Sequence, residues 1–241
     1  MPKHATHLID RRAVAERTME FLFERPAGFD FKAGQFVTLI LPDPPFTDAR
    51  GNRRAFTLCS PPQEAGHLAI ATRMTEHALK RCLAEVPPGT PCEILGPSGD
   101  FTLHDDPAVP AVLIGGGIGI TPLRSILLDA VARRLAHRIT LVYSNRTPEG
   151  AAYHEEIARV AAAHPNVTYI PTMTQAERSR RPWSGERRRV DAAFLRETVD
   201  DLTRAIVYVA GPPGIVAAVA RALAEAGADP TRLRLDEFDG Y

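Results

Sequence analysis

The pattern of apolar and polar positions in the first half of the chain predicts short antiparallel strands. Apolar or alternating runs are separated there by turns rich in proline and glycine, and they cover 35–41, 54–60, 68–73 and 91–95. Segment 76–86 instead has the leucine spacing of a helix and ends at Pro87. This half therefore predicts an antiparallel barrel or sandwich that includes one short helix.

The second half alternates apolar strands with helices. Strands are expected near 111–114, 139–143, 167–171, 206–209 and 233–235, with helices near 121–135, 151–163, 192–199 and 213–226. Continuous apolar strands joined by helices are typical of a parallel sheet covered on both faces. The turn-forming stretch 104–107 lies between the two patterns. We therefore expect one domain over residues 1–106 and a second over residues 107–241.

Composition and charge narrow the functional classes. Of 241 residues, 44% are apolar and 24% are charged, which excludes a disordered or fibrous chain. The 29 basic residues balance the 29 acidic ones, so we expect neither nucleic acid nor an anionic membrane as a partner. No stretch approaches the roughly 18 consecutive apolar residues of a membrane span, and the first ten residues lack a signal-peptide run. A cytoplasmic protein is expected, with a monomer as the simplest state.

A glycine-rich segment directly follows the first apolar strand of the second half. It reads Gly115, Gly116, Gly117, Ile118, Gly119, Ile120, Thr121, Pro122. Thr121 suits a helix N-cap and Pro122 the first helical position. Glycines let the backbone approach a ligand, and the free N–H groups of a helix start favour an anion. We therefore predict a dinucleotide pyrophosphate site here, and a tight turn without a ligand is the alternative.

The end of the next strand bears on which nicotinamide nucleotide binds. Ile120 stands where the usual G-x-G-x-x-G pattern has its last glycine, so the domain is a variant of that fold. Ser144, Asn145 and Arg146 stand where an NAD-binding fold usually carries an acidic residue for the ribose 2′-hydroxyl. Because a hydroxyl and a guanidinium suit a 2′-phosphate, we favour NADPH over NADH. An arginine that is only solvated is the alternative.

Segment 54–60 carries a second group of candidate binding residues. On a strand, Arg54 and Phe56 share one face and Thr57 lies on the other unless a bend intervenes. Such a strand can present a cation, a ring and a hydroxyl to one ligand. By spacing alone, a strand with one exposed arginine is the default interpretation.

The order of the motifs resembles the ferredoxin-NADP reductase superfamily over nearly the whole chain. The motifs are RAFTLCS at 54–60, GPSGDF at 96–101, GGGIGITP at 115–122, AGPP at 210–213 and EFDGY at 237–241. The resemblance implies a stand-alone flavoenzyme in which an FAD-binding antiparallel β-barrel precedes a Rossmann-like NAD(P)-binding domain. The spacing of Cys59, Cys82 and Cys92 fits neither a zinc site nor an iron–sulfur cluster.

In this family a pattern of arginine, any residue, tyrosine, then serine or threonine binds the flavin, and it falls on Arg54, Phe56 and Thr57. The resemblance implies that Arg54 holds the FAD pyrophosphate, Phe56 packs on the flavin and the Thr57 hydroxyl approaches flavin N5. Phe56 lacks the usual tyrosine hydroxyl. The family's glycine and serine before its short helix are replaced by Thr75, Glu76, His77 and Ala78. The remaining cofactor contacts expected in this domain are Ala55, Thr72, Arg73, Met74, His77, Ala78 and Leu79.

The two motifs nearest the C-terminus are expected to meet the nicotinamide. In the AGPP segment the contacts would be Ala210, Gly211 and Pro212, and many relatives have a cysteine at the position of Ala210. Hydride transfer needs proximity and alignment, so we expect slower chemistry rather than none. Glu237 and Phe238 match the family's acidic-then-aromatic ending, whose ring covers the flavin, and Tyr241 is the alternative ring. A frayed tail without a role is the remaining alternative. The expected catalytic residues are Thr57, Glu237 and Phe238.

The resemblance therefore implies a reductase that passes electrons from NADPH through FAD to a separate one-electron acceptor. That acceptor would be a ferredoxin, a flavodoxin or the iron–sulfur component of an oxygenase. A reductase of free flavin or ferric chelates is one alternative, and a non-catalytic redox-sensing or electron-relay subunit is another. The arginine-rich loop 175–189 is expected either to steer an acidic partner or to be a mobile, solvated loop. The eight histidines show no metal-ligand spacing.

Overall fold

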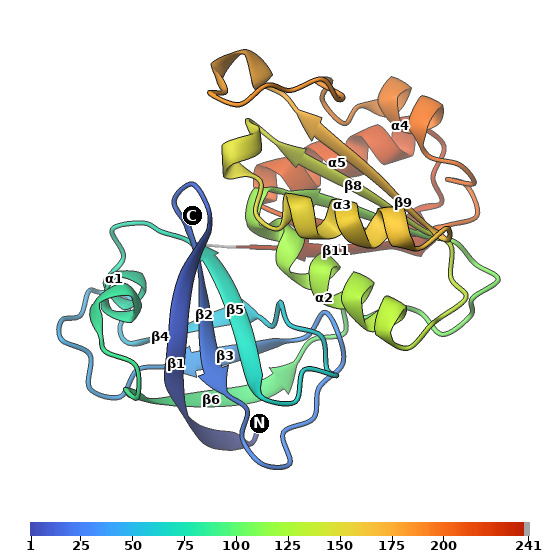
Figure 1. Ribbon diagram of the computed structural model, residues 1–241. Coiled ribbons are helices and arrows are strands. Elements are labelled where there is room, and N and C mark those ends of the chain that lie inside the picture. Colours follow the sequence, from blue (N-terminus) through green and yellow to red (C-terminus); the bar gives the residue numbers. More distant parts are fainter. Residues whose placement is uncertain (239–241) are drawn as a thin grey trace.

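The computed structural model describes residues 1–238, which form two domains that each contain one sheet (Figure 1). In this part of the chain the first sheet has six antiparallel strands in the order β4-β3-β6-β1-β2-β5. Its elements are β1 (Lys3–Ala15), β2 (Thr18–Glu24), β3 (Phe36–Ile40), β4 (Arg53–Thr57), β5 (His67–Arg73), α1 (Ala78–Glu85) and β6 (Pro91–Ser98). The predicted antiparallel first domain is confirmed.

The antiparallel sheet curls until its two edge strands meet. β1 pairs with β6 through its first residues and with β2 through the rest. At the edges Leu58 pairs with Ile70, and the N–H of Cys59 donates to the carbonyl of Ala69 at 2.8 Å. The interior is filled by buried apolar side chains such as Phe21 and Leu39. The barrel form is therefore the correct one of the two that the sequence allows.

The second sheet is parallel and carries helices on both faces. Its elements are β7 (Ala111–Gly116), α2 (Ile120–Ala132), β8 (Ile139–Asn145), α3 (His154–Ala163), β9 (Val167–Met173), α4 (Ala192–Thr198), β10 (Ile206–Gly211), α5 (Pro213–Glu225) and β11 (Leu233–Glu237). Within residues 1–238 the strand order is β11-β10-β7-β8-β9. Alternate residues of β7 face opposite sides: Leu113 packs with α2 and α3, and Val112 packs with α4 and α5. This confirms the predicted parallel α/β domain.

The path of the chain through this sheet creates a crevice at its carboxyl edge. From β7 the chain runs outward to β9 and then returns to β10 on the other side of β7 (Figure 1). In open α/β sheets, ligands bind at the carboxyl ends of the strands where the order reverses in this way. The point between β7 and β10 is therefore the expected ligand position.

Buried contacts join the two domains. The Nη1 atom of Arg124 donates to the carbonyl of Cys59 at 2.6 Å, and the Ser125 hydroxyl donates to the carbonyl of Ser60 at 2.8 Å. The Tyr153 hydroxyl donates to Oε1 of Glu20, a carboxylate that is only 1% exposed, at 2.9 Å. These contacts fix the barrel against α2 and the start of α3. We keep the boundary between residues 106 and 107 as a proposal.

The start of α2 differs from the expectation. A 3-10 turn over Gly117–Gly119 leads into the helix, so Thr121 is not the N-cap and Pro122 is not the first helical residue. Instead of accepting an N–H bond, the Thr121 hydroxyl donates to the carbonyl of Ile118 at 3.1 Å. In a regular helix the N–H of residue 122 would donate to the carbonyl of Ile118, but Pro122 has no N–H. The Thr121 hydroxyl donates to this carbonyl instead.

The strands β1 and β2 were not expected from the sequence, whereas the other strands and helices match the expected elements apart from shifted ends. The helices predicted to begin at residues 76 and 151 begin at Ala78 and His154. No helix within the described residues is long and apolar enough to cross a membrane.

Candidate functional site

A cavity of about 400 Å³ lies where the edge of the barrel meets the carboxyl edge of the parallel sheet. This volume falls in the range of roughly 300–1,000 Å³ that is typical of small-molecule sites. Both domains line it. The first contributes Phe36, Arg50, Arg54, Ala55, Phe56, Thr57, Ala71, Thr72, His77, Leu79 and Lys80, and the second contributes Thr121, Asp236, Glu237 and Phe238.

The edge strand β4 supplies Arg54, Phe56 and Thr57 to the cavity. Neighbouring residues Phe56 and Thr57 both line it although they alternate along the strand, because β4 ends at Thr57 and the chain then bends toward β5. The Nη1 atom of Arg54 donates to the carbonyls of Arg50 and Arg53 at 2.5 Å. The sequence motif is therefore assembled on one wall of the cavity.

The other terminal nitrogen of Arg54 has a single ion-pair contact and no hydrogen bond within the described residues. Nη2 is buried, has no hydrogen-bond partner among the described residues, and lies 3.7 Å from Oδ1 of Asp48. Buried guanidinium nitrogens are normally hydrogen-bonded, so a nitrogen without a hydrogen bond, on a residue that lines the cavity, fits an anionic group of a bound molecule. This observation fits the predicted diphosphate of FAD.

Two basic groups of the cavity lining, Lys80 of α1 and Arg50 of the loop before β4, were not predicted from the sequence. Nη1 of Arg50 lies 3.2 Å from Nε2 of His77, and Nζ of Lys80 donates to the carbonyl of Arg73 at 3.1 Å. Burial, and then the nearby charges of Arg54 and Arg50, lower the pKa of Lys80 to about 8. Lys80 could have been found from its position three residues after His77 on the same helix face. Arg50 could not, because its place depends on how the preceding loop folds.

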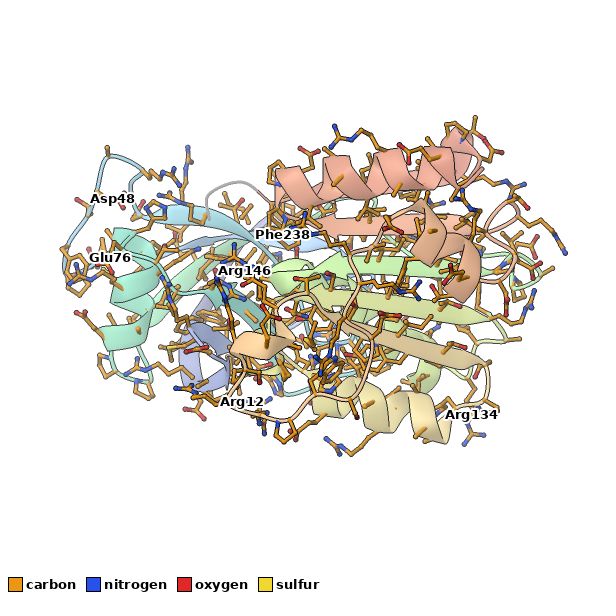
Figure 2. The ribbon with its side chains drawn as sticks, turned by 90° about the horizontal axis from the view of Figure 1, so that it is seen from above. Arg12, Asp48, Glu76, Arg134, Arg146 and Phe238 are labelled. Atoms are coloured by element: carbon orange, nitrogen blue, oxygen red, sulfur yellow. The ribbon has the colours of Figure 1, made fainter. Side chains whose placement is uncertain are left out.

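Several other predicted contacts of the first domain lie outside the cavity lining. The guanidinium of Arg73 donates to the carbonyl of Gly150 in the second domain at 3.4 Å. Met74 packs against the barrel core, and Ala78 is buried at the start of α1. Glu76 is exposed, and Figure 2 shows it at the outer end of the first domain, well away from Phe238. The roles of Arg73, Met74 and Ala78 in cofactor binding stay predictions.

Protein packing explains most of the glycines in the turn after β7. A Cβ on Gly119 would lie 2.0 Å from the carbonyl oxygen of Ala210, and one on Gly116 would lie 2.7 Å from the side chain of Ile215. Gly117 differs: its φ is +55° and a Cβ there would meet nothing within 4 Å. Packing therefore requires Gly116 and Gly119 whether or not a ligand binds, and of these three only Gly117 would place a Cβ in open space. Contact of these glycines with a dinucleotide stays a prediction.

The end of β8 lies beside this turn. Ser144 pairs with Gly116 in the parallel register and is half-buried, whereas Asn145 is buried. Arg146 is exposed after the strand, and Figure 2 shows where it lies at the carboxyl edge of the sheet. These three residues do not line the cavity. Their contact with the adenosine phosphate of a nucleotide stays a prediction.

The C-terminal strand places Phe238 next to the AGPP turn. β11 runs parallel to β10 with Glu237 opposite Gly211, and the N–H of Phe238 donates to the carbonyl of Gly211 at 3.0 Å. Phe238 and the exposed Glu237 both line the cavity, whereas Ala210 is fully buried. Pro212 is half-buried and leads into α5. The alternative ring, Tyr241, lies outside the described residues.

Asp236 is the other acidic residue on this side of the cavity. It is half-buried, and burial together with the charge of Asp100 raises the pKa of its carboxyl to about 6. The proton on this carboxyl therefore titrates close to neutral pH, next to the position predicted for the nicotinamide.

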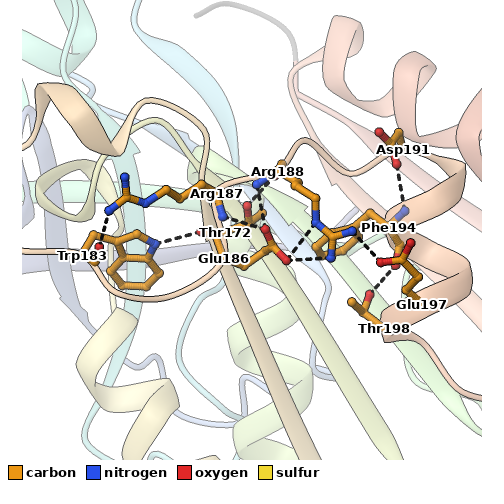
Figure 3. A network of polar contacts seen from close by, with 9 residues as sticks. All are labelled: Thr172, Trp183, Glu186, Arg187, Arg188, Asp191, Phe194, Glu197 and Thr198. Atoms are coloured by element: carbon orange, nitrogen blue, oxygen red, sulfur yellow. Dashed lines mark hydrogen bonds and ion pairs between the residues drawn. The ribbon is translucent and has the colours of Figure 1, made fainter.

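The arginine-rich loop is held by a network of contacts (Figure 3). The carboxylate of Glu186 accepts from the guanidinium of Arg188 at 2.8 Å and from the backbone N–H of Arg187, and these bonds hold its pKa at about 2. Arg188 also pairs with Glu197 of α4 at 2.6 Å, and the indole N–H of Trp183 donates to the carbonyl of Glu186. These contacts attach the loop to α4 and fix its conformation. That the loop steers an acidic partner stays a prediction.

Comparisons with known proteins agree with this architecture. A family model described as the oxidoreductase NAD-binding domain matches residues 113–221. Ferredoxin-NADP reductase B of Sorangium cellulosum is 30% identical over 209 residues, which cover 86% of this chain and 81% of that protein. The glycine betaine monooxygenase reductase subunit of Chromohalobacter salexigens is 29% identical over 224 residues, or 92% of this chain. This chain spans only 60% of that subunit.

Solved structures share the fold over nearly the whole chain. A cytochrome P450 reductase from Amycolatopsis superposes with a TM-score of 0.82 at 25% identity, covering 98% of this chain and 70% of that one. A ferredoxin NADP⁺ reductase from Neisseria gonorrhoeae, solved with bound FAD and NADP, gives a TM-score of 0.78 at 18% identity. The match covers 99% of this chain and 100% of that one.

Proposed function

Because the chain belongs to the ferredoxin-NADP reductase family of NAD(P)H oxidoreductases, we propose that it passes electrons from NADPH through FAD to a separate one-electron acceptor. The observation that carries this proposal is the cavity between the domains. Thr57 of the barrel and Phe238 of the parallel-sheet domain line the same space, and so does Arg54, whose buried Nη2 atom makes no hydrogen bond within the described residues.

The chain's own residues define how the cofactor would be held. Arg54 would donate to the diphosphate, and Phe56 would pack against the flavin as part of the wall of the cavity. The Thr57 hydroxyl would lie near the reactive edge, and Phe238 would cover the face that the nicotinamide must reach. When bound, FAD supplies the conversion between two-electron transfer from a nicotinamide and one-electron transfer to an acceptor.

The nicotinamide nucleotide is proposed to lie along the carboxyl edge of the parallel sheet. Gly117 leaves open space at the start of the 3-10 turn, and the first N–H groups of the turn and of α2 are suited to a pyrophosphate. Gly211 and Pro212 would border the nicotinamide next to Phe238, whose N–H already donates to Gly211. Thr121, which lines the cavity from the second domain, would lie between the two cofactors.

The acceptor is proposed to be a ferredoxin, a flavodoxin or the iron–sulfur component of an oxygenase. Two kinds of relative support this choice: a ferredoxin-NADP reductase and reductase subunits or components of monooxygenases. Several of these relatives are longer than this chain, which spans 51% of the phenol 2-monooxygenase reductase component of a Pseudomonas strain.

Two measurements test the proposed activity. Stopped-flow mixing of the FAD-loaded protein with NADPH should bleach the flavin absorption rapidly, and no bleaching over many minutes would instead support a non-catalytic module. Steady-state assays should then compare ferredoxin, flavodoxin, free riboflavin and ferric chelates as acceptors. Turnover of free flavin or ferric chelates alone would contradict the proposed protein acceptor.

A further inference from the structure

A buried arginine lies where the two domains meet. Arg124 of α2 is only 7% exposed, and its guanidinium contacts three other residues. Nε and Nη2 donate to the two carboxylate oxygens of Glu156 at 2.6 and 2.8 Å, and Nη1 donates to the carbonyl of Cys59 at 2.6 Å. The guanidinium also lies over the ring of Tyr153, 4.3 Å from its centroid. Arg124 therefore joins α2 and α3 to the edge of the barrel.

The bond to Cys59 holds the segment that carries the predicted flavin motif. Cys59 lies two residues after Thr57, which lines the cavity at the end of β4. The next residue is held in the same way, because the Ser125 hydroxyl donates to the carbonyl of Ser60 at 2.8 Å. Two consecutive carbonyls of the barrel are thus bound by two consecutive side chains of α2.

The other end of this connection lies beside the proposed nicotinamide site. Arg124 stands three residues after Thr121, which is nearly one turn further along α2. Thr121 lines the cavity, and the glycine-rich turn directly precedes it. A short path through Arg124 therefore connects Thr57 on the barrel side of the cavity with Thr121 on the other side.

The chemistry of this contact favours a fixed orientation. A buried ion pair adds little net stability compared with packed apolar side chains, because both charges lose their hydration. A guanidinium bound by both oxygens of one carboxylate, however, has a defined plane and direction. Apolar side chains could hold the domains together without fixing this geometry. The pair of Arg124 and Glu156 is therefore suited to set how the domains are oriented.

Tyr153 extends the contact to a second point on the barrel. Its hydroxyl donates to Oε1 of the buried Glu20, whose Oε2 accepts from Nε of Arg12 at 2.5 Å. Tyr153 has a left-handed φ of +60°. A bulky residue rarely adopts this conformation, so the surrounding contacts must hold it. Two separate points, β2 and the segment after β4, thus fix the orientation of the barrel.

We propose that Arg124 is a positioning residue that sets the distance and alignment between the flavin held by the barrel and the nicotinamide held by the second domain. The proposal rests on the proposed function, because it assigns these two cofactors to the cavity. Arg124 is not among the described residues that line the cavity, so it acts through the segments that it joins. It takes no part in the hydride transfer itself, in which the C4–H bond of NADPH breaks and an N–H bond forms at N5 of FAD with the transfer of two electrons.

Hydride transfer is sensitive to this kind of positioning. A misplacement of about 1 Å caused by a distant mutation can slow a reaction about a hundredfold. Arg124→Met keeps a long side chain but removes every hydrogen bond of the guanidinium. We therefore expect FAD reduction at saturating NADPH to be slower on the order of ten- to a hundredfold. The dissociation constant of FAD and the NADPH concentration at half-saturation should stay unchanged, because no contact with either cofactor is lost.

Two milder substitutions separate positioning from general damage, and they decide the proposal if Arg124→Met does not fold. Arg124→Lys keeps one charged donor but cannot bind Glu156 and Cys59 together, so it should slow the reaction less than Arg124→Met. Glu156→Gln keeps Arg124 and its bond to Cys59 and should slow the reaction by about three- to tenfold. Arg138→Met is the matched control, because Arg138 pairs with Asp201 inside the second domain at 2.5 Å, and it should react like the unchanged protein.

A distance measurement on the protein without cofactors tests the proposal independently of activity. Spin labels are attached at Glu85→Cys in α1 and Arg221→Cys in α5, two exposed positions in different domains. The native cysteines Cys59, Cys82 and Cys92 are buried and do not compete for the label. Double electron–electron resonance should give one narrow distance distribution when Arg124 is present and a wider or shifted distribution in Arg124→Met.

Unchanged rates of FAD reduction in Arg124→Met and Glu156→Gln would overturn the proposal. So would a loss of FAD affinity in proportion to the loss of rate, since that would show general damage to the site. An unchanged distance distribution in Arg124→Met would also overturn it, because the domains would then be oriented without Arg124. If NADPH does not reduce FAD in the unchanged protein, the proposed function fails, and the distance measurement still decides whether Arg124 orients the domains.

Discussion

Replacing Gly119 by alanine tests whether packing against β10 shapes the glycine-rich turn. Gly119 has an ordinary helical φ of −57°, so its backbone conformation suits any residue. The added Cβ would lie 2.0 Å from the carbonyl oxygen of Ala210, where ordinary contact begins at 3.4 Å. The obstacle is main chain, which cannot rotate away as a side chain can. The turn or the end of β10 must therefore move by about 1.4 Å.

The cost of this movement sets the expected loss of stability. Overpacking of a core costs about 1–3 kcal/mol, and a main-chain obstacle places Gly119→Ala near the upper end. For a protein of this size, 1 kcal/mol corresponds to a melting-temperature change of about 2–4 °C, so we expect a decrease of about 6–12 °C. Gly117→Ala is the matched control, because its Cβ would meet nothing within 4 Å and only the positive φ opposes it. That strain costs about 1–2 kcal/mol.

Thermal unfolding of the apoprotein, followed by circular dichroism, measures both variants under identical conditions. The result that would refute the reasoning is a Gly119→Ala protein that melts within about 2 °C of the unchanged protein, or one that is more stable than Gly117→Ala. Either would mean that the turn is not pressed against the carbonyl of Ala210. The glycine would then have to be explained by a ligand after all.

Three further predictions follow from the site and the domain contact. Arg146→Ala should raise the KM for NADPH by an amount equivalent to about 1.5–3 kcal/mol and leave that for NADH unchanged; equal effects would show that Arg146 does not bind the 2′-phosphate. Burial and the charge of Asp100 raise the pKa of Asp236 from 3.8 to about 6. Folding is therefore favoured by protonation of this carboxyl, and this contribution to the free energy of unfolding is complete below pH 4 and lost as the pH rises through 6. Asp236→Asn should therefore stabilise the protein at pH 8 by about 1–2 kcal/mol, after allowance for solvent screening, and not at pH 4, and equal melting shifts at both pH values would contradict this. Tyr153→Phe removes a donor from the buried Glu20 and should cost about 1–3 kcal/mol in denaturant unfolding, a loss that would be absent if water replaced the hydroxyl.

The fold was predictable where side chains repeat with the period of their element. β7 and β8 are apolar on both faces because helices cover both, so their sequence alone indicates a buried parallel strand. β1 carried no such signal. Most of its residues are exposed or half-buried, so apolar side chains do not alternate regularly along it. The strand pairs first with β6 and then with β2. In β2, the buried Glu20 interrupts the apolar alternation, since it binds Arg12 and Tyr153 instead of packing.

Some residues of the candidate site were predictable from the sequence, and others were not. Arg54, Thr57 and Phe238 were found from motifs and their order along the chain, and the structure brings all three to one cavity. Arg50 was missed because only the folding of its loop over the start of α1 places it there. The N-cap assigned to Thr121 was wrong because the residues before it form a 3-10 turn that sequence spacing does not specify.

The most direct test of the account is whether the protein holds FAD. Purified protein should be incubated with FAD, separated from free flavin by gel filtration, and its absorption spectrum recorded before and after anaerobic addition of NADPH. The account predicts about one FAD retained per chain, with a flavin spectrum that NADPH bleaches. Colourless protein after gel filtration would contradict it.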